Sequence, residues 1–358
     1  IEQAKLNGIL KYLPNGELIH APFSLSPYAM PESIFEKMAE LTVPFNELMI
    51  KVSRNTDFLI HHLEPIAAID PFLKMLLKCR SKEINQNCQL LIQRNDFFIA
   101  NVKHNDYKQN TTPTNEITEE SVLRQVELNT VSASFPFLIT RLYQLHKNLF
   151  EQNKLPKVIQ NNPLDAVVDA FAHSVQNYGI SDSVILVVVQ SNEKNIFDQI
   201  GLQQHLWIKH NIATVRKTLV EIHKDGKLRQ GHLVVDGKTV ALTYFRAGYT
   251  PDDFPEEQAF KGRQLIEASS TIQVPDMGMQ LSGMKKIQQV LTKKEVLADF
   301  VTEEISRRFL KTFAKMHTLD EIINTPEGEV RASEWLSNHA DDYVLKPQRE
   351  GGGNNYFG

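Results

Sequence analysis

The chain has 358 residues, of which 42% are hydrophobic and 23% are charged, and its formal net charge is −4. This composition is typical of a globular protein of roughly two domains. The acidic balance provides no basic surface for nucleic acid, and the longest apolar run, Val184 to Val189, is too short to span a membrane.

Two cysteines, Cys79 and Cys88, lack the spacing of metal-binding motifs. They predict two thiols, with a local disulfide in an oxidising compartment as the alternative. The sequence begins at Ile1 rather than at a methionine, so we expect a processed or trimmed chain, with any targeting segment outside it.

The first third of the chain predicts helices and then a strand. Apolar residues recur at helical spacing from Ser33 to about Ala68, and Pro44 is expected to interrupt this helix. A second helix is expected from Pro71 to about Lys82. Leu90 to Val102 predicts a strand and a turn, with a second strand after the turn as an alternative. The polar segment from Lys108 to Glu119 predicts an exposed loop.

The middle of the chain predicts alternating strands and helices. Val122 to Phe135 predicts a strand, and Phe137 to Phe150 predicts a helix. A further helix is expected from Ala166 to Tyr178, ending at Gly179. Ser183 to Gln190 is apolar on both faces, which predicts a central parallel strand covered by helices on both sides.

The remainder predicts one more strand and helix pair, a hairpin and two charged helices. A helix is expected from about Asp198 to His210, followed by a strand at "IATVRKT". The Asp236-Gly237 pair between two strand patterns predicts a β-hairpin. Lys285 to Val301 and Glu303 to Met316 predict helices, and a last strand is expected at Asp342 to Gln348.

The segment "VELNTVSAS" carries side chains that suit a cation and its ligand. Alternate residues of a strand share a face, so Glu127 and Asn129 are expected to project together. A carboxylate beside an amide oxygen suits Mg²⁺. The hydroxyls of Ser132 and Ser134 would bind a carboxylate or an amide if the chain stays extended. The alternative is a polar strand face at a sheet edge.

Polar residues also follow the buried strand and the hairpin. Ligands of open α/β sheets bind outside the carboxyl ends of the strands, where Glu193, Asn195 and Gln199 are expected. The alternative is a solvated loop with Asn195 or Asp198 as a helix N-cap. Arg246 suits a bidentate carboxylate clamp, with a surface turn as the alternative.

The last segment combines lysines with a glycine-rich loop. Lys285 at a helix start opposes the helix dipole, which is weak evidence for a phosphate partner; a solvated lysine face is the favoured alternative. Three glycines (351–353) allow backbone N–H groups to approach phosphates. Lys346 adds a positive charge, and Glu350 suits a Mg²⁺ that bridges phosphates. A flexible linker is the alternative.

Five strings resemble eukaryotic glutathione synthetase, in the order "ELNTVSASF", "NEKNIFDQ", "YFRAGY", "GMKKIQQ" and "VLKPQREGGGNN". The similarity runs from about Ala21 to the end of the chain. It implies an α/β ATP-grasp ligase fold with an inserted parallel-sheet α/β substrate domain. The implied divisions are residues 1–180 for a helical and sheet framework, 181–284 for the inserted domain, and 285–358 for the start of the nucleotide-binding region.

The resemblance also implies a reaction. It is the ATP- and Mg²⁺-dependent ligation of γ-glutamylcysteine to glycine, or to a related amino acid, through an acyl phosphate. A cytoplasmic homodimer is implied, with no nucleic acid or membrane partner. Catalysis of this kind consists mainly of positioning and charge neutralisation.

The matching motifs imply roles residue by residue. The implied magnesium ligands are Glu127, Asn129 and Glu350. The implied ATP contacts are Lys285, Lys346, Gly351, Gly352, Gly353 and Asn355. The implied γ-glutamylcysteine contacts are His104, Ser132, Ser134, Glu193, Asn195, Gln199, Arg246 and Tyr249. Of these residues, Arg246 and Lys346 are the implied catalytic pair.

The chain departs from the family's motifs at several positions. The family's N-R-S-D-Y, matched to "KHNDY", places His104 where the family has an arginine that is always charged. Pro136 and Phe137 replace two glycines and add bulk near the substrate motif, and Ala247 replaces an aspartate. These departures predict retained ATP and Mg²⁺ binding with a shifted acceptor specificity or rate.

Two further expectations follow from the resemblance. Family members continue past the glycine-rich loop with the rest of the ATP-binding sheet, so we expect the protein to extend beyond Gly358. The alternative function is a diverged, secreted glutathione synthetase-like effector with altered or lost ligase activity, as occurs in plant-parasitic nematodes.

Overall fold

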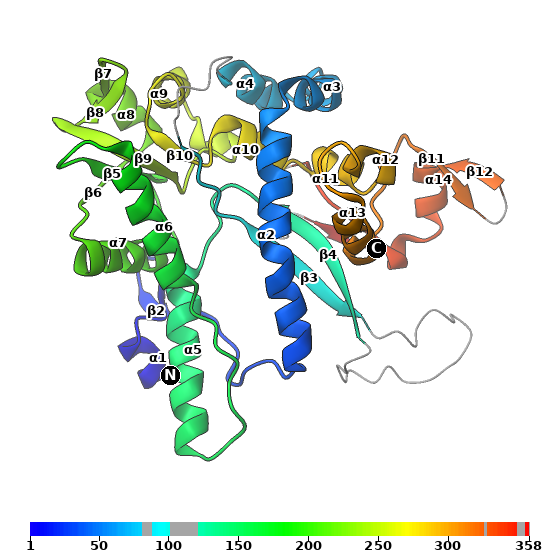
Figure 1. The fold of residues 1–358 in the computed structure, drawn as a ribbon, viewed down its shortest axis with the longest axis horizontal. Helices are drawn as coiled ribbons and strands as arrows, with labels where there is room; N and C mark the ends of the chain where they lie inside the picture. Colours follow the sequence, from blue (N-terminus) through cyan, green and yellow to red (C-terminus); the bar gives the residue numbers. More distant parts are fainter. Residues whose placement is uncertain (81–87, 101–120, 326–327, 349–354, 358) are drawn as a thin grey trace. The chain divides into compact units, whose positions relative to one another are not determined.

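The computed structural model describes residues 1–80, 88–100, 121–325, 328–348 and 355–357, and it contains two compact units (Figure 1). Unit 1 comprises Ile1–Glu32, Ser81–Ile92 and Ser132–Asp276. Unit 2 comprises Ser33–Arg80, Gln93–Val131 and Met277–Gly358. Each unit is therefore assembled from segments that are distant in the sequence.

Unit 1 is built on one mixed sheet with the strand order β6-β5-β9-β8-β7, and β10 pairs with the end of β9. All five residues of β5 are buried, and β5 runs parallel to β6 and β9, so the predicted central parallel strand is confirmed. The strands are β5 (Val184–Val188), β6 (Thr214–Lys217), β7 (Lys227–Arg229), β8 (His232–Val235), β9 (Lys238–Phe245) and β10 (Ile272–Val274).

The predicted hairpin is also confirmed. Strands β8 and β9 are antiparallel on either side of Asp236 and Gly237. Both residues have positive φ, 50° and 78°, as the favoured two-residue hairpin turn requires.

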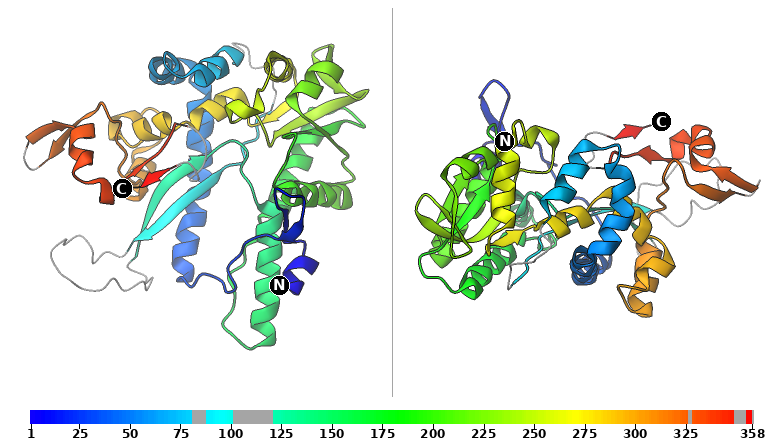
Figure 2. Two further views of the ribbon diagram at one scale, coloured as in Figure 1. Left: turned by 180° about the vertical axis from the view of Figure 1, so that it is seen from behind. Right: turned by 90° about the horizontal axis from the view of Figure 1, so that it is seen from above.

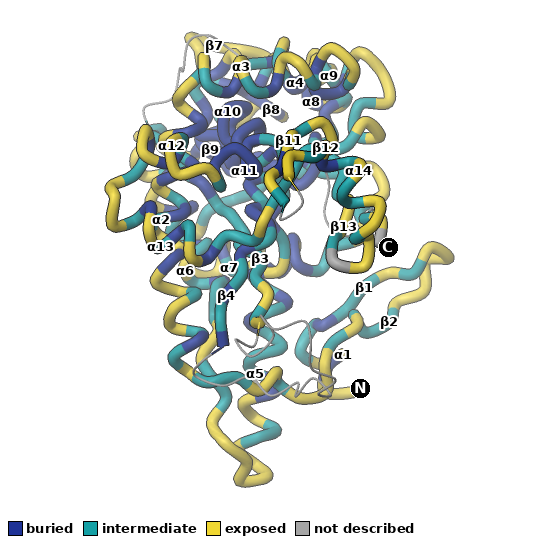
Figure 3. Tube along the Cα trace, turned by 90° about the vertical axis from the view of Figure 1, so that its right-hand side faces the viewer, coloured by how far each residue is buried: buried dark blue, intermediate teal, exposed yellow. Residues whose placement is uncertain are grey.

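Helices cover both faces of this sheet (Figures 1 and 2). Val187 and Tyr244 belong to the core formed with α6 (Pro163–Tyr178) and α7 (Ile196–His210). Val188 and Phe245, one residue further along their strands, belong to the core formed with α8 (Leu219–Asp225) and α9 (Glu257–Glu267). This alternation explains why the central strands read as continuously apolar, and it accounts for the buried strands in Figure 3.

Two glycines let helices of unit 1 pack closely. A Cβ on Gly262 of α9 would overlap the backbone carbonyl oxygen of Leu219, so only glycine permits the contact between α8 and α9. A Cβ on Gly201 of α7 would overlap the ring of Phe137 on α5 (Pro136–Gln152). Phe137 therefore fills the space beside Gly201, and the guanidinium of Arg141 lies 5.0 Å from its ring centroid.

An N-terminal segment completes unit 1. The short helix α1 (Glu2–Leu6) precedes the antiparallel strands β1 (Leu10–Tyr12) and β2 (Leu18–His20). Ala4 and Ile9 form a small apolar cluster with Leu145 of α5. The predicted stop of α6 is confirmed, because Gly179 adopts a left-handed conformation with a φ of 78°.

Unit 2 begins with α2 (Glu32–Arg54), α3 (Thr56–Ala67) and α4 (Pro71–Cys79). The prediction that Pro44 interrupts the first helix was wrong, since α2 continues through it. Phe45 is fully buried and stacks on Phe309 of α13 (Glu303–Thr312), with ring centroids 4.2 Å apart. Burial of this apolar face outweighs the hydrogen bond that a proline removes from a helix.

The second part of unit 2 is a β-pair followed by short helices. Strands β3 (Arg94–Ala100) and β4 (Val122–Asn129) are antiparallel. The strand predicted to reach Phe135 ends at Asn129, and positive φ values at Ser132 and Phe135 show that the chain turns. The helix predicted for residues 285–301 is two shorter helices, α11 (Lys285–Leu291) and α12 (Lys294–Leu297).

The last elements of unit 2 are small. They are α10 (Met277–Ser282), α14 (Ala332–Ser337), the antiparallel pair β11 (Ile322–Thr325) and β12 (Gly328–Arg331), and the antiparallel pair β13 (Val344–Leu345) and β14 (Tyr356–Phe357). Among the described residues, no helix has both the length and the apolar content needed to cross a membrane.

Candidate functional site

In unit 1, a buried carboxylate joins α7 to the start of α5. Asp198 is 2% exposed and accepts hydrogen bonds from the backbone N–H groups of Phe135 (2.8 Å), Phe137 (3.0 Å) and Leu138 (3.1 Å). Asp198 thus caps α5. The alternative predicted from the sequence, that Asp198 caps its own helix α7, was wrong. The N-cap position of α7 is Asn195, whose side chain makes no capping hydrogen bond.

We expect substitution of Asp198 by asparagine to destabilise unit 1 by about 2 kcal/mol. The Oδ1 atom of D198N can still accept from Phe137 and Leu138, but its amide NH₂ would face the N–H of Phe135. Urea unfolding at pH 7 measures the loss, with the exposed D252N as the matched control. Equal stability of D198N and D252N would contradict this prediction.

The same substitution should change the pH dependence of stability. Burial raises the pKa of Asp198, an effect only partly offset by hydrogen bonds from the backbone of Leu138 and Phe135 and by the charge of Arg246. The pKa of an aspartate in the unfolded chain is about 4. Because the pKa of Asp198 is higher in the folded protein, Asp198 adds to the free energy of unfolding below about pH 4. This contribution is lost as the pH rises through the folded-state pKa. The unaltered protein should show this fall in the free energy of unfolding, and D198N should not.

The turn before α5 is bound by the guanidinium of Arg246, which follows β9 and is 4% exposed. Its NH1 donates to the carbonyl of Ala133 at 3.0 Å, and its NH2 donates to Ser134 Oγ. Ser132 Oγ donates to the carbonyl of Arg246 at 3.3 Å. The two serines are therefore brought to Arg246 by a turn and not by an extended strand.

Three predicted substrate contacts of unit 1 have buried polar atoms with no hydrogen-bond partner among the described residues. These atoms are Arg246 Nε, Glu193 Oε2 and Gln199 Nε2. Glu193 uses its other oxygen to accept from the backbone N–H of Asn195 at 2.8 Å. Because unpaired buried polar groups are costly, a cluster of them near the carboxyl ends of β5 and β9 indicates a polar ligand.

Tyr249 is positioned by a separate carboxylate. Asp253 Oδ2 accepts from the backbone N–H groups of Gly248, Tyr249 and Thr250 at 2.9–3.1 Å, which fixes the turn after β9. The Tyr249 hydroxyl lies 3.4 Å from Gln190 Nε2. Burial, reinforced by the charge of Asp253, raises the pKa of Tyr249, so its hydroxyl keeps its proton at neutral pH.

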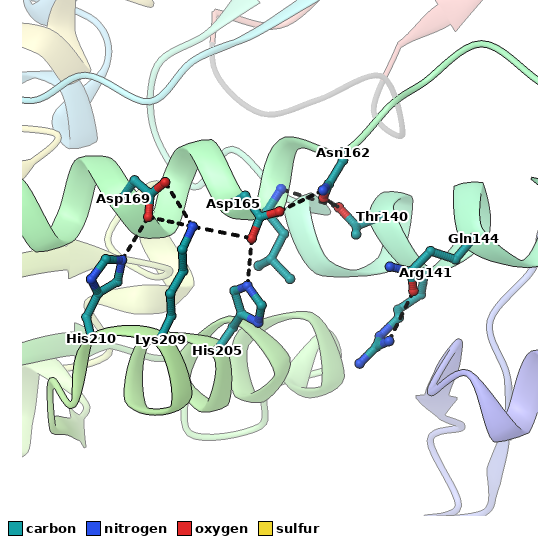
Figure 4. Close-up of polar contacts among 10 residues, drawn as sticks. Thr140, Arg141, Gln144, Asn162, Asp165, Asp169, His205, Lys209 and His210 are labelled. Atoms are coloured by element: carbon teal, nitrogen blue, oxygen red, sulfur yellow. Dashed lines mark hydrogen bonds and ion pairs between the residues drawn. The ribbon is translucent and has the colours of Figure 1, made fainter.

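Helix α7, which carries Gln199 and Asp198, contacts α6 through hydrogen bonds and an ion pair along one side (Figure 4). Asp165 Oδ1 contacts His205 Nε2 at 2.8 Å, and Asp169 Oδ1 contacts both Lys209 Nζ and His210 Nε2 at 2.8 Å. The hydrogen bond from His205 lowers the pKa of Asp165. The side chains involved are partly exposed to solvent, so each contact contributes little to stability.

In unit 2, a buried carboxylate lies between two ammonium groups. Glu127 on β4 is 4% exposed; its Oε1 lies 3.3 Å from Lys285 Nζ and its Oε2 lies 3.5 Å from Lys346 Nζ. Burial lowers the pKa of Lys285. The negative charge of Glu127 opposes this shift, and the positive charge of Lys346 adds to it. Lys285 is therefore buried at the start of α11 and is not part of a solvated lysine face.

The segment after β13 is held to the start of α11. Gln348 accepts from the backbone N–H of Lys285 through its carbonyl (3.3 Å) and from that of Lys286 through Oε1 (2.9 Å). Lys346 Nζ also donates to the carbonyl of Val126 at 3.2 Å. Of the other predicted ATP and metal residues, Asn355 is half-buried, whereas Glu350 and the glycines 351–353 lie outside the described residues.

Sequence reasoning missed two charged residues on β3. Asp96 pairs directly with Glu127 across the sheet, and its Oδ2 accepts from Asn129 Nδ2 at 3.2 Å. Arg94 Nε donates to Asp96 Oδ1 at 2.8 Å. Asp96 therefore connects Arg94 to the predicted metal ligand Asn129.

A signal for these residues was present in the sequence. The string "QRNDF" at residues 93–97 fits the family's N-R-S-D-Y with the arginine and aspartate in place, whereas "KHNDY" lacks the arginine. His104 lies outside the described residues, so its predicted role stays a prediction. Arg94 is therefore a second candidate for the arginine of this motif.

The donor set of unit 2 suits a hard divalent cation. Glu127 supplies carboxylate oxygens, and Asn129 keeps its amide oxygen available because its Nδ2 donates to Asp96. Among the described residues, no group of three or more histidine, cysteine or carboxylate side chains is arranged as a complete metal site. Residues outside the described ranges, or a ligand, would have to complete the coordination.

The chain belongs to the eukaryotic glutathione synthase family. The family's ATP-binding domain matches residues 6–358, which confirms the resemblance seen in the motifs. The chain is 37% identical to the chloroplastic glutathione synthetase of Solanum lycopersicum over 97% of its own length, and 32% identical to the glutathione synthetase of Xenopus laevis over 100%. It spans 61% of the tomato protein and 75% of the frog protein.

A solved structure has a similar fold. It is a glutathione synthetase-like effector from Globodera pallida in its apo form, with a TM-score of 0.74. The alignment covers 100% of this chain and 73% of the effector at 19% sequence identity, which supports a shared mixed helix and sheet fold.

Proposed function

We propose that the protein is an ATP- and Mg²⁺-dependent carbon–nitrogen ligase that joins γ-glutamylcysteine to glycine or a related amino acid. The observation that carries this proposal is the family match over residues 6–358, together with two buried polar clusters on the matching motifs. The proposed architecture is an ATP-grasp ligase with residues 181–284 as an inserted substrate domain, and the proposed assembly is a homodimer.

The polar cluster of unit 1 would bind the dipeptide. Glu193 Oε2 is an acceptor for an ammonium group, and Arg246 Nε and Gln199 Nε2 are donors for carboxylate or carbonyl oxygens. Ser132 and Ser134 in the turn before α5, Asn195 before α7 and Tyr249 after β9 would complete the contacts. These groups match the charges of a γ-glutamyl compound, which carries an ammonium group and carboxylates.

The charged cluster of unit 2 would bind magnesium and the ATP phosphates. Glu127 and Asn129 would hold the cation, which neutralises phosphate charge when it is bound. Lys285 and Lys346 would contact phosphate oxygens, with the glycines 351–353 and Asn355 supplying further contacts and Glu350 a further metal ligand. Glu127 keeps both lysines close enough to act on one phosphate group.

The proposed reaction has two steps. ATP transfers its γ-phosphoryl group to the C-terminal carboxylate of the dipeptide, which releases ADP and forms an acyl phosphate. The glycine amine then attacks the acyl carbon, phosphate leaves, and a proton is lost from the amine. Arg246 and Lys346 would stabilise the charge that develops on substrate oxygens.

The test is ADP release by the full-length protein with Mg²⁺-ATP, γ-glutamylcysteine and each of a panel of amino acids. We expect multiple turnovers of ADP release only when both the dipeptide and an acceptor are present. Full activity with glycine would contradict a shifted acceptor specificity. The departures at Phe137 and Ala247 lie in packed positions, against Gly201 and in the apolar core respectively, so an effect on the acceptor would be indirect.

The alternative proposal is a secreted effector that has altered or lost the ligase activity, in place of a cytoplasmic enzyme. The fold similarity to the Globodera pallida effector supports this alternative. Calorimetry with Mg²⁺-ATP separates the two, because an active ligase must bind the nucleotide. No binding at millimolar ATP would favour the effector.

A further inference from the structure

Arg216 lies on β6 next to the proposed dipeptide site, and no role has yet been assigned to it. It is in register with Val187 of β5, which is in register with Tyr244 of β9. All three face the layer formed by α6 and α7. Arg246 follows two residues after Tyr244, near the carboxyl ends of the same strands.

The guanidinium of Arg216 binds two amides of α7. NH2 donates to Gln199 Oε1 at 2.9 Å, and NH1 donates to Gln203 Oε1 at 3.3 Å. Because a guanidinium can only donate, it fixes which end of each amide is oxygen. The opposite ends of both amides, Gln199 Nε2 and Gln203 Nε2, are buried and have no hydrogen-bond partner among the described residues. Gln199 lies one helical turn closer to the start of α7, on the side of the carboxyl ends of the strands.

The charges around Arg216 support the same arrangement. Burial lowers its pKa, the charge of Glu193 raises it, and the charge of Arg246 lowers it further. Arg216 therefore lies within the electrostatic influence of both Glu193 and Arg246, and Glu193 Oε2 has no hydrogen-bond partner among the described residues. The buried carboxylate of Asp198 also interacts with Arg246, so two carboxylates face the two guanidinium groups. The atoms left without a described partner, Glu193 Oε2, Arg246 Nε and Gln199 Nε2, remain open to polar groups of a ligand.

We propose that Arg216 is a positioning residue that holds the Gln199 amide with its Nε2 directed at the ligand. Gln199 then donates a hydrogen bond to a carboxylate or carbonyl oxygen and cannot accept one from an ammonium group there. This inference rests on the proposed function. It assigns to β6 a part in substrate binding that the motif resemblance did not indicate.

Three variants test this inference, with isothermal titration of γ-glutamylcysteine as the readout. R216M removes both hydrogen bonds, and we expect at least about a tenfold weaker Kd. R216K keeps the charge but cannot bind both amides as a fork, so it should remain similarly impaired. Q199E keeps an oxygen for Arg216 but removes the Nε2 donor, so it should bind the dipeptide at least about tenfold more weakly.

Q203E is the matched control, because it makes the same change in the other amide bound by Arg216, one helical turn further from the start of α7 and from the proposed ligand. It should leave the affinity for γ-glutamylcysteine within about twofold of the unaltered protein, and the melting temperatures of Q199E and Q203E should be similar. In ADP release, R216M and R216K should raise the KM for the dipeptide and leave the KM for ATP unchanged. A merely structural role would change both constants or neither.

The outcomes separate the inference from the function on which it rests. Unchanged affinity in R216M, or in Q199E, when the unaltered protein binds γ-glutamylcysteine would overturn the inference alone. If R216K bound γ-glutamylcysteine as tightly as the unaltered protein, the charge of residue 216 would be sufficient. That result would also overturn the inference that Arg216 positions Gln199. No binding of γ-glutamylcysteine by the unaltered protein would overturn both the proposed function and this inference.

Discussion

Replacing Glu127 by glutamine is expected to lower Mg²⁺-dependent ADP release by roughly 100-fold. The carboxylate oxygens of Glu127 lie 3.3 Å from Lys285 Nζ and 3.5 Å from Lys346 Nζ. E127Q removes this negative charge between the two ammonium groups, and it removes a proposed metal ligand. The two lysines would then repel each other without compensation. Steady-state kinetics at several Mg²⁺ concentrations measures the loss.

The same variant should shift the pH profile. Lys285 must be protonated to attract phosphate, and burial already lowers its pKa. Loss of Glu127, which raises that pKa, would lower it further, so activity or nucleotide affinity should decline at a lower pH in E127Q than in the unaltered protein. If activity declined at the same alkaline pH in E127Q and in the unaltered protein, the proposed role of Glu127 and Lys285 would be contradicted.

Two controls separate chemistry from folding. E295Q makes the same change on an exposed position of α12 and should behave as the unaltered protein. E127D keeps the negative charge on a shorter side chain, so it should retain the fold and part of the nucleotide affinity. Normal ADP release by a folded E127Q would exclude Glu127 from the metal site.

Substitution of Gly262 by alanine is expected to give the largest loss of stability, about 3 kcal/mol. The added Cβ would overlap the carbonyl oxygen of Leu219, which belongs to the backbone of α8 and cannot rotate away. Helices α8 and α9 would have to separate. Urea unfolding measures the change, with Q264A on the exposed side of α9 as the control.

This loss should also reach the proposed substrate site. The next residue, Arg263, is fully buried, and its guanidinium lies 3.7 Å from the ring centroid of Phe245, which precedes Arg246. We therefore expect G262A to weaken γ-glutamylcysteine binding at temperatures where the protein is still folded. Equal stability of G262A and Q264A would contradict the close helix contact.

Local patterns were sufficient to predict the centre of unit 1. The apolar run of β5 and the Asp236-Gly237 turn have one favoured structure each, because both signals lie within a few neighbouring residues. Pro44 was misjudged because the burial of Phe45 against Phe309 is a tertiary effect. The break between α11 and α12 likewise has no strong signal in the sequence.

The candidate site was predictable only where the family motifs are contiguous. Glu127 and Asn129 share a strand, so their common face follows from the pleat. Asp96 comes to Glu127 only through the register of β3 with β4, and Asp198 reaches α5 only through packing of α7. Arg216 likewise depends on the order of strands in the sheet. Long-range pairings of this kind leave no local pattern.

The contact between Phe137 and Gly201 also restricts how these two positions can evolve. Any side chain at position 201 overlaps the ring of Phe137, so a mutation there is tolerated only after the ring has been lost. Conversely, a change of Phe137 to glycine would remove the ring beside α7 and leave space that a later side chain at position 201 could fill. The order of the two substitutions is therefore constrained.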